Sequence, residues 1–149
     1  MKPEPNGEWE ISHSPIKLTD VGRELFNVSA DTEKIHLHQM HIDYVVEAPK
    51  PTEKNKDLLP PGTKVHIWGT SGHTGVQGCY IRDRLFTSQG HMEFNEQMVK
   101  RQLEKRVESG ALAKEEADEA SERAHWKHDG LLVAKAVVRF FHGDNDQVG

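Results

Sequence analysis

The spacing of apolar residues changes near residue 95, and this change limits the folds that are open to the chain. Before it, short runs alternate polar and apolar residues, a period of two that is typical of half-buried strands. Beyond it, apolar residues recur every four positions, which is typical of helices. The runs are Glu8–Ser12, Lys34–His41 and Lys64–Trp68 in the first part, and Val99, Leu103 and Val107 in the second. We therefore predict an α/β fold with helices at its C-terminal end.

The β-rich part is expected to contain one short helix, one loop and one hairpin. Thr19 is placed to cap a helix that runs to about residue 26. Residues 44–46 are strand-like, and the prolines of residues 48–62 predict a surface loop. The hairpin is predicted for the runs Val76–Ile81 and Leu85–Ser88.

Three helices are predicted after residue 95. The first begins behind an Asn95 cap and stops near Gly110. The second, Glu115–Ala124, is charged and rich in alanine, which favours a solvated helix over a binding tail. The last, Leu131–Phe141, is apolar on most of its circumference. We expect such a helix to be covered on several sides.

The bulk composition excludes two classes of partner. The chain has 149 residues, enough for a single domain over residues 1–149. Its net charge of -5 and lack of a basic stripe argue against nucleic acid, and no apolar run approaches the ~20 residues of a membrane span. The only cysteine, Cys79, cannot form an internal disulfide, which favours a reducing, cytoplasmic location.

The stretch from Thr87 to Asn95 carries the main chemical signal. A strand-like run ends at Gly90, then comes His91-x-Glu93, and then the cap of a helix. α/β proteins place catalysis at strand ends, and residues two apart in an extended segment point the same way. Glu93 could therefore orient the imidazole of His91 and stabilise its charge, as the carboxylate does in a Cys-His-Glu arrangement.

This stretch resembles the Gln-Gly-His-Pro-Glu-Phe motif of class I glutamine amidotransferase-like proteins, the group that includes γ-glutamyl peptidases. Further segments agree with the same family in the same order, so that the resemblance covers residues 7–141. They are Glu8–Ile11, His38–Asp43 (similar to His-Gln-Met-His-Arg-Asp), Val76–Ile81 and His128–Gly130.

The resemblance implies a fold and a set of site residues. The fold would be a partial flavodoxin-like, class I glutamine amidotransferase-like layer structure with a mixed sheet. The reaction would be amide hydrolysis that releases ammonia from glutamine or cleaves γ-glutamyl bonds, without a cofactor or a metal. The catalytic residues would be His91 and Glu93, and the substrate-binding residues would be His38, Gln39, Met40, His41 and Asp43.

The sequence departs from the family pattern in three places. Met92 replaces a proline, which removes a fixed backbone angle between His91 and Glu93. Ile42 replaces an arginine and deletes a charge beside the substrate loop. The Gly-x-Cys-x-Gly motif of the nucleophile is absent, and Cys79 lies inside a predicted strand, where we interpret it as packed.

We therefore expect the chain to correspond to the C-terminal half of the domain and to be inactive alone. The nucleophile-bearing half would be missing because the gene product is truncated, is a split-enzyme subunit, or has diverged.

Two alternatives belong to other functional classes. The set His36, His38 and His41, with His91 or Glu93 as a further ligand, would suit a zinc or copper ion. Strand alternation opposes this, because it turns His41 away from the other two histidines. A non-catalytic interaction protein is the second alternative, since a half-domain with an uncovered sheet edge and an apolar last helix would self-associate or bind a protein partner.

Overall fold

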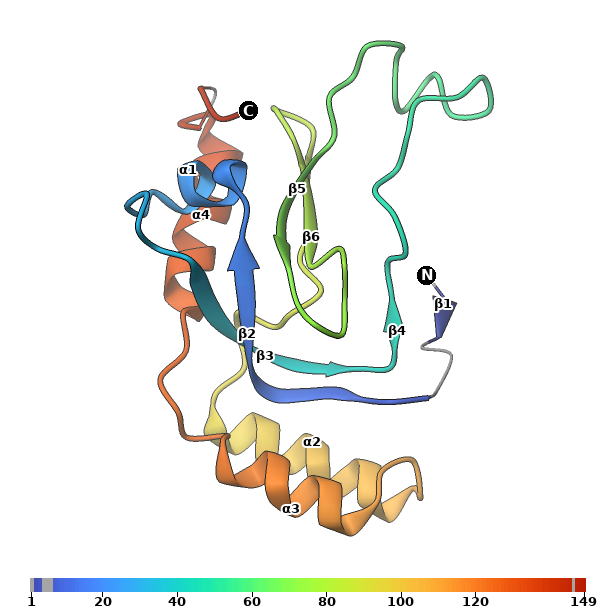
Figure 1. Ribbon diagram of the computed structural model, residues 1–149, viewed down its shortest axis with the longest axis vertical. Helices are drawn as coiled ribbons and strands as arrows, with labels where there is room; N and C mark the ends of the chain where they lie inside the picture. The colour runs from blue at the N-terminus through green and yellow to red at the C-terminus, as the bar shows by residue number, and fades with distance from the viewer. Residues whose placement is uncertain (1, 4–6, 146) are drawn as a thin grey trace.

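A computed structural model of the chain describes residues 2–3, 7–145 and 147–149. Figure 1 shows its elements, which in chain order are β1 (Lys2–Pro3), β2 (Glu10–Leu18), α1 (Asp20–Phe26), β3 (Lys34–His41), β4 (Asp43–Tyr44), β5 (His66–Thr70), β6 (Gly78–Ile81), β7 (Leu85–Phe86), α2 (Glu96–Glu108), α3 (Lys114–Glu122) and α4 (Gly130–His142). Among these residues, none of the helices has the length and apolar character that crossing a membrane requires.

Five strands form one curled sheet in the order β3-β2-β5-β6-β7, and β1 pairs separately with β4. The expected mixed sheet is wrong for the described residues, because each of these strand pairs is antiparallel. Adjacent β6 and β7 are joined by a tight turn, which leaves no room for the long crossover that parallel strands need. The predicted hairpin is thus confirmed, whereas flavodoxin-like layering stays a prediction.

The segment that follows β7 closes the curl of the sheet. The Gln89 amide donates to the Gln77 carbonyl at 2.7 Å, just before β6, and the His91 amide donates to the His38 carbonyl of β3 at 2.8 Å. Residues 89–91 therefore lie between β6 and the outer edge of β3. The motif predicted to carry catalysis is held by backbone hydrogen bonds on both sides.

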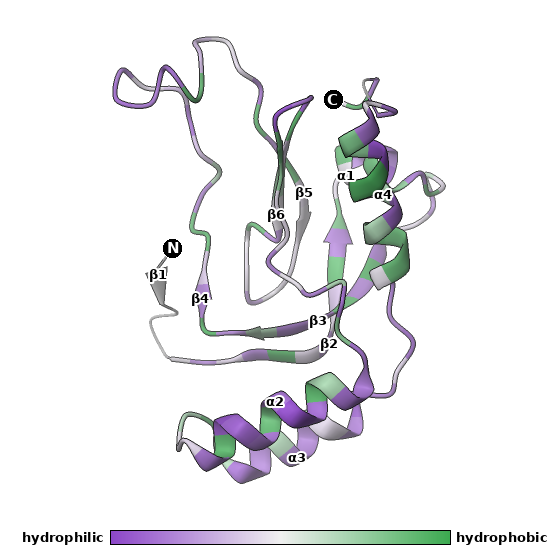
Figure 2. Ribbon diagram, turned by 180° about the vertical axis from the view of Figure 1, so that it is seen from behind, coloured by the Kyte–Doolittle hydropathy of each residue, from purple (hydrophilic) through white to green (hydrophobic). Residues whose placement is uncertain are grey.

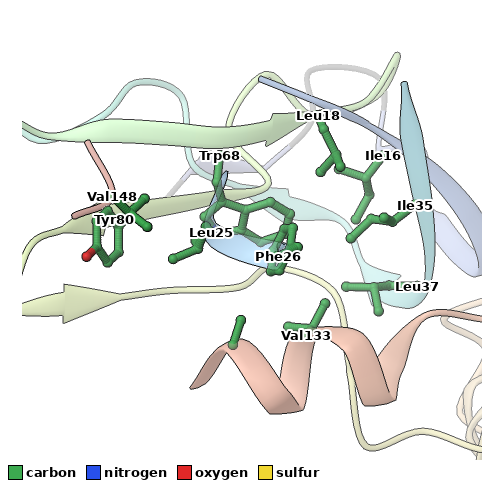
Figure 3. Packing of buried hydrophobic residues seen from close by; sticks show 11 residues of the cluster. Ile16, Leu18, Leu25, Phe26, Ile35, Leu37, Trp68, Tyr80, Val133 and Val148 are labelled. Carbon is green, nitrogen blue, oxygen red and sulfur yellow. The ribbon is translucent and has the colours of Figure 1, made fainter. Parts of the chain in front are cut away.

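The main hydrophobic core lies between the sheet and the pair α1 and α4 (Figure 3). Trp68 of β5 and Leu25 and Phe26 of α1 are almost completely buried there, together with Val133 of α4. Gly22 lets α1 lie directly on the sheet, because a Cβ at this position would come within 2.0 Å of the Trp68 carbonyl oxygen. The absence of a side chain at Gly22 thus allows the close approach of α1 to β5.

A second core lies between the helices α2 and α3 and the part of the sheet where β2 begins and β3 ends. Its members include Ile11, Met40, Val99 and Leu103. Figure 1 shows α2 and α3 as a separate layer away from α1 and α4. Helix α3 is not fully solvated as predicted, since Ala117 and Ala120 are buried, along with Ala124 just beyond its end.

The predicted starts of the early helix and of the first late helix are confirmed. Thr19 accepts a hydrogen bond from the Gly22 amide at 3.1 Å, and Asn95 accepts one from the Met98 amide at 2.9 Å. Asp129 precedes α4 but makes no side-chain cap. It instead accepts from the His36 amide at 2.7 Å, while its own amide donates to the His36 carbonyl at 2.7 Å. This reciprocal pair fixes the start of α4 to β3.

Two strand boundaries differ from the prediction. β2 continues past Ser12 and through Pro15, which pairs with His36 of β3. A proline is tolerated here because β5 pairs with β2 only at Lys17 and Leu18. No strand of the described residues therefore needs a backbone N–H from Pro15 on the edge of β2 that faces away from β3. The strand predicted for residues 44–46 ends at Tyr44, where its pairing with β1 stops.

Helix α4 is covered on one side only. Gly130, Val133 and Ala136 are buried, whereas Leu131 and Phe141 are 69% and 78% exposed. Figure 2 shows this apolar character along the helix. The sequence predicted that other segments would cover α4 on several sides, but the described residues cover it on one side only.

Truncation of Leu25 to alanine should lower the free energy of unfolding by about 2–5 kcal/mol, because it leaves a cavity in the main core. The matched variant Leu131→Ala removes the same atoms from an exposed site and should change stability by less than about 0.5 kcal/mol. Urea unfolding of both variants measures the difference. Equal losses in the two variants would contradict this account of the core.

Candidate active site

The structure brings His91 and Glu93 into direct contact. His91 Nδ1 lies 2.7 Å from Glu93 Oε1, and the imidazole stacks on the Phe94 ring with centroids 3.9 Å apart and an interplanar angle of 4°. Met92, which stands where the resembled motif has proline, does not prevent this contact. The two side chains remain accessible, with 35% and 56% of their surfaces exposed.

The chain around His91 is positioned by close backbone packing. A Cβ on Gly90 would come within 2.8 Å of Gln39 Nε2 and 3.1 Å of Leu37 Cβ, so only glycine allows this approach to β3. Beyond His91, the chain turns into α2 through the Asn95 cap. The strand, glycine, His-x-Glu and capped-helix order of the sequence thus produces the expected local geometry.

The contact sets the electrostatics of the pair. Burial alone would raise the pKa of the Glu93 carboxyl, but the hydrogen bond from His91, a backbone hydrogen bond and the charge of His91 together lower it. A carboxylate at Nδ1 favours the tautomer with the proton on that nitrogen. Nε2, the opposite ring nitrogen of His91, is then free to accept a proton. This arrangement suits a general base with an orienting carboxylate.

His91 and Glu93 line a hollow of about 350 Å³, which we call the His91 hollow. Its other wall is formed by the apolar residues Val137, Phe140 and Phe141 of α4. Phe141 also belongs to the exposed side of that helix. The hollow is therefore continuous with apolar surface.

The residues predicted to bind substrate are divided between the surface and the interior. Met40, His41 and Asp43 line a second hollow of about 480 Å³, together with Ile42, Trp9, Gln89 and Arg106, which we call the Arg106 hollow. His38 and Gln39 are completely buried and line neither hollow. Their role toward a substrate stays a prediction. Gln89 lines both hollows and so lies between them.

Arg106 was missed by sequence reasoning. Its guanidinium carbon lies 5.7 Å from the centre of the Trp9 ring, and its Nε is buried without a hydrogen-bond partner. Among the described residues no carboxylate lies within ion-pair distance of it. Arg106 therefore brings a positive charge to the hollow beside Ile42, the position at which the resembled motif has arginine. It lies far from residue 42 in sequence, so no local pattern could have indicated it.

Sequence reasoning also missed a chain of hydrogen bonds between buried polar side chains. Gln39 Nε2 donates to Gln77 Oε1 at 3.0 Å, and Gln77 Nε2 donates to both carboxylate oxygens of Glu10, at 3.1 and 3.0 Å. Burial would raise the pKa of the Glu10 carboxyl, but the close contact with His41, hydrogen bonds with Ser71 and Thr74, and the charge that His41 carries when protonated lower it. The strand pattern of Glu8–Ser12 suggested alternation, yet Glu10, Ile11 and Ser12 are buried in succession.

The histidines proposed as metal ligands do not converge. His36 stacks on His13 with ring centroids 4.7 Å apart, and His38 packs against His128 at 4.8 Å. His41 instead lies 2.9 Å from Glu10. As strand alternation suggested, His41 turns away from His36 and His38, and a metal site made of these three is wrong.

His38 has an unusual environment. Its ring is completely buried, and neither ring nitrogen has a hydrogen-bond partner. Burial, followed by the charges of His128, His13 and His91, lowers the pKa of His38 from 6.5 to about 4. The side chain is thus held neutral near pH 7.

Cys79 is buried in β6, on a strand rather than on a strand-to-helix turn. Burial raises the pKa of its thiol, and a hydrogen bond with Thr87 opposes this only in part. A buried neutral thiol is a poor nucleophile. The geometry agrees with the interpretation of Cys79 as a packed residue.

Comparison with known proteins gives two relatives, both fungal. A Schizosaccharomyces pombe protein named provisionally as glutamine amidotransferase-like is 25% identical over 132 residues, which cover 89% of this chain and 46% of the relative. A Saccharomyces cerevisiae protein named provisionally as a glutamine amidotransferase is 26% identical over 127 residues, which cover 85% and 43%. The relatives support a glutamine amidotransferase-like family.

The chain spans less than half the length of the curated relatives that it matches. No protein-family model matches it. The similarity to glutamine amidotransferase-like proteins is thus distant, and the curled antiparallel sheet and the helices of the described residues are compatible with it.

Lowering the pH should destabilise the folded chain through His38. The unfolded residue takes up a proton near pH 6.5, whereas the folded residue stays neutral until about pH 4. Between these values the unfolded state binds more protons, so stability falls as the pH falls. The loss attributable to His38 should be on the order of 3 kcal/mol between pH 7 and pH 4.

Urea unfolding across this pH range tests whether His38 causes the loss of stability. The pH dependence should become shallower in His38→Leu and should not change in His125→Leu, which alters an exposed histidine. An unchanged slope in His38→Leu would assign the acid sensitivity to other groups.

Proposed function

We propose that this chain supplies the general base and its orienting carboxylate to a glutamine amidotransferase-like site. The reaction is hydrolysis of the side-chain amide of glutamine or of a γ-glutamyl bond. The observation that carries the proposal is the contact of 2.7 Å between His91 Nδ1 and Glu93 Oε1 beside an open hollow. The names and the match of the two fungal relatives agree with this chemistry.

The nucleophile in this proposal is a cysteine outside the chain. Cys79 is buried in β6 and its thiol has a raised pKa, so it does not meet the requirements of a nucleophile. In the proposed reaction His91 Nε2 takes the proton of the external thiol, and the thiolate attacks the amide carbonyl. The imidazolium then returns the proton to the leaving amine, and water hydrolyses the thioester with His91 again acting as base.

The apolar side of α4 is the proposed docking surface for the nucleophile-bearing half. Leu131, Val138 and Phe141 lie on one helix face and are 69%, 54% and 78% exposed. Phe141 is also part of the wall of the His91 hollow. A half-domain that covered this face would therefore sit next to the base.

Arg106 is proposed to bind the α-carboxylate of the substrate. It lines the hollow that contains Met40, His41 and Asp43, and no carboxylate of the described residues pairs with it. Arginine matches a carboxylate through two parallel hydrogen bonds. In this role it would replace the charge that Ile42 lacks.

The second candidate function is a non-catalytic interaction protein. The same exposed face of α4 favours it, because contiguous apolar surface of this kind promotes association. The two functions differ in whether the complex formed with a partner turns over glutamine.

Turnover should require a nucleophile-bearing segment in addition to these 149 residues. The chain alone should release no ammonia from glutamine and no glutamate from a γ-glutamyl peptide, because in triad enzymes removal of the nucleophile alone costs on the order of 10⁶ in turnover. Mixing with a family N-terminal half that carries Gly-x-Cys-x-Gly should restore turnover. His91→Ala in this chain should then abolish it, and Glu93→Gln should reduce it strongly.

The controls separate assembly from chemistry. Cys79→Ser should match the parent chain in both activity and fold. Association of the two halves is measured by sedimentation, with Leu131→Asp to weaken docking. A complex that forms but does not turn over either substrate would favour the interaction protein, and turnover by the isolated chain that Cys79→Ser abolishes would overturn the proposal.

In the active complex, Arg106→Gln should raise KM for glutamine by about 10-fold to 100-fold and leave kcat nearly unchanged, because it removes binding shared by ground and transition states. Steady-state kinetics give the two constants. Arg101→Gln, on an exposed part of the same helix, is the matched control. A fall in kcat without a change in KM would place Arg106 in another role.

A further inference from the structure

Three potential metal ligands meet at a place separate from His91 and Glu93. Glu10 begins β2, His41 ends β3 directly opposite it, and His73 lies in the connection between β5 and β6. Glu10 Oε2 is 2.9 Å from His41 Nε2 and 3.6 Å from His73 Nδ1, and the three ligand atoms all lie within 4.8 Å of one another. The side chains are only 7%, 9% and 14% exposed.

The outward ring nitrogens of both histidines face backbone carbonyls. His41 Nδ1 lies 2.9 Å from the Asp43 carbonyl oxygen, and His73 Nε2 lies 3.0 Å from the Glu8 carbonyl oxygen. A carbonyl oxygen can only accept, so these two nitrogens carry the protons. When the rings are neutral, the inward atoms, His41 Nε2 and His73 Nδ1, therefore carry lone pairs, and His73 Nδ1 also lies 2.9 Å from Thr74 Oγ1.

A carboxylate that faces two imidazole nitrogens in a nearly closed site is balanced by positive charge, supplied either by an additional proton on a histidine or by a bound metal ion. His41 Nε2 is buried and makes no hydrogen bond of acceptable geometry, although the Glu10 oxygen is 2.9 Å away. Histidines that bind metals almost always donate their other ring N–H to a carboxylate or a backbone carbonyl. Both histidines here have that orientation.

The spacing of the ligand atoms suits a small tetrahedral ion. Zinc binds imidazole nitrogen and carboxylate oxygen at about 2.0–2.2 Å, which places tetrahedral ligands roughly 3.3–3.5 Å apart. The distances of 2.9 and 3.6 Å from Glu10 Oε2 lie on either side of this value. Two histidines and one glutamate are a known ligand set for zinc.

The carboxylate is also held in place from behind. Gln77 Nε2 donates to both of its oxygens, and Thr74 Oγ1 donates to Oε2 at 2.9 Å. Such outer hydrogen bonds orient a ligand before the metal arrives. These hydrogen bonds hold the Glu10 carboxylate in place, and its Oε2 still faces the two imidazoles.

We propose that Glu10, His41 and His73 bind one divalent transition-metal ion, with Zn²⁺ as the best match. No local pattern indicates this set of ligands, because Glu10 and His73 are distant in sequence from His41 and form no recognisable spacing. The ion would join β2, β3 and the connection between β5 and β6 at one point. Low exposure of the ligands makes this a stabilising site, which shares His41 with the wall of the Arg106 hollow but lies apart from His91 and Glu93.

The test is titration of the full chain with Zn²⁺ after metal has been removed with a chelator. Calorimetry near neutral pH should give one strong site per chain, and saturating Zn²⁺ should raise Tm by about 5 °C or more. Mg²⁺ should not replace Zn²⁺, since it prefers oxygen ligands. Substitution with Co²⁺ should give the visible absorption of a tetrahedral site.

Matched variants identify the ligands. Glu10→Gln keeps the shape of the side chain and removes its charge, and it should weaken Zn²⁺ binding by about 100-fold, as should His73→Asn. His36→Gln alters the separate group of stacked histidines and should bind like the parent chain. Circular dichroism in chelator establishes that each variant is folded.

Each outcome decides for or against the proposal. Loss of binding in Glu10→Gln and His73→Asn, with binding kept in His36→Gln, supports it. Absence of tight binding in the parent chain means that protons bridge Glu10 and His41, and it overturns the proposal. Binding that survives both ligand variants overturns it as well.

Discussion

The two backbone hydrogen bonds that hold residues 89–91 between β6 and β3 determine the geometry of the candidate site. Gln89 is bound to Gln77 and His91 to His38, so the segment cannot shift along either strand without losing both bonds. Because an unpaired buried amide costs about 1–3 kcal/mol, this position is strongly preferred. The imidazole of His91 is thereby placed at the edge of the sheet, where Glu93 and Phe94 set its orientation.

Local features of the structure followed well from the sequence. Thr19 and Asn95 cap helices, residues 82–84 turn between two strands, and His91 meets Glu93, because each depends on neighbours within a few positions. The period of two at residues 34–41 gave β3 with both of its ends. The contact of His91 with Glu93 was expected from spacing and from the resemblance together.

Features that depend on distant segments did not follow. Arg106 reaches the hollow beside Ile42 from another layer of the fold, and Glu10 meets His73 only because the sheet curls. The direction of strand pairing was also wrong, since a mixed sheet was inferred from the resemblance and not from the residues. Alternation identified strands but could not reveal that Glu10, Ile11 and Ser12 would all be buried, with Ile11 in the second core and Ser12 hydrogen-bonded to the Ala120 carbonyl.

The attachment of the α2 and α3 layer has an evolutionary consequence. The chain leaves β3 beside His38, through the amide of His91, and returns to β3 beside His36, through the amide of Asp129. The two ends of residues 92–128 are thus anchored two positions apart on one strand. An excursion with adjoining ends can change in length at its far tip, near residue 110, without moving the strands that it leaves and rejoins. This helical pair is therefore a part of the molecule in which homologous chains can diverge in size while keeping the same arrangement of His91 and Glu93.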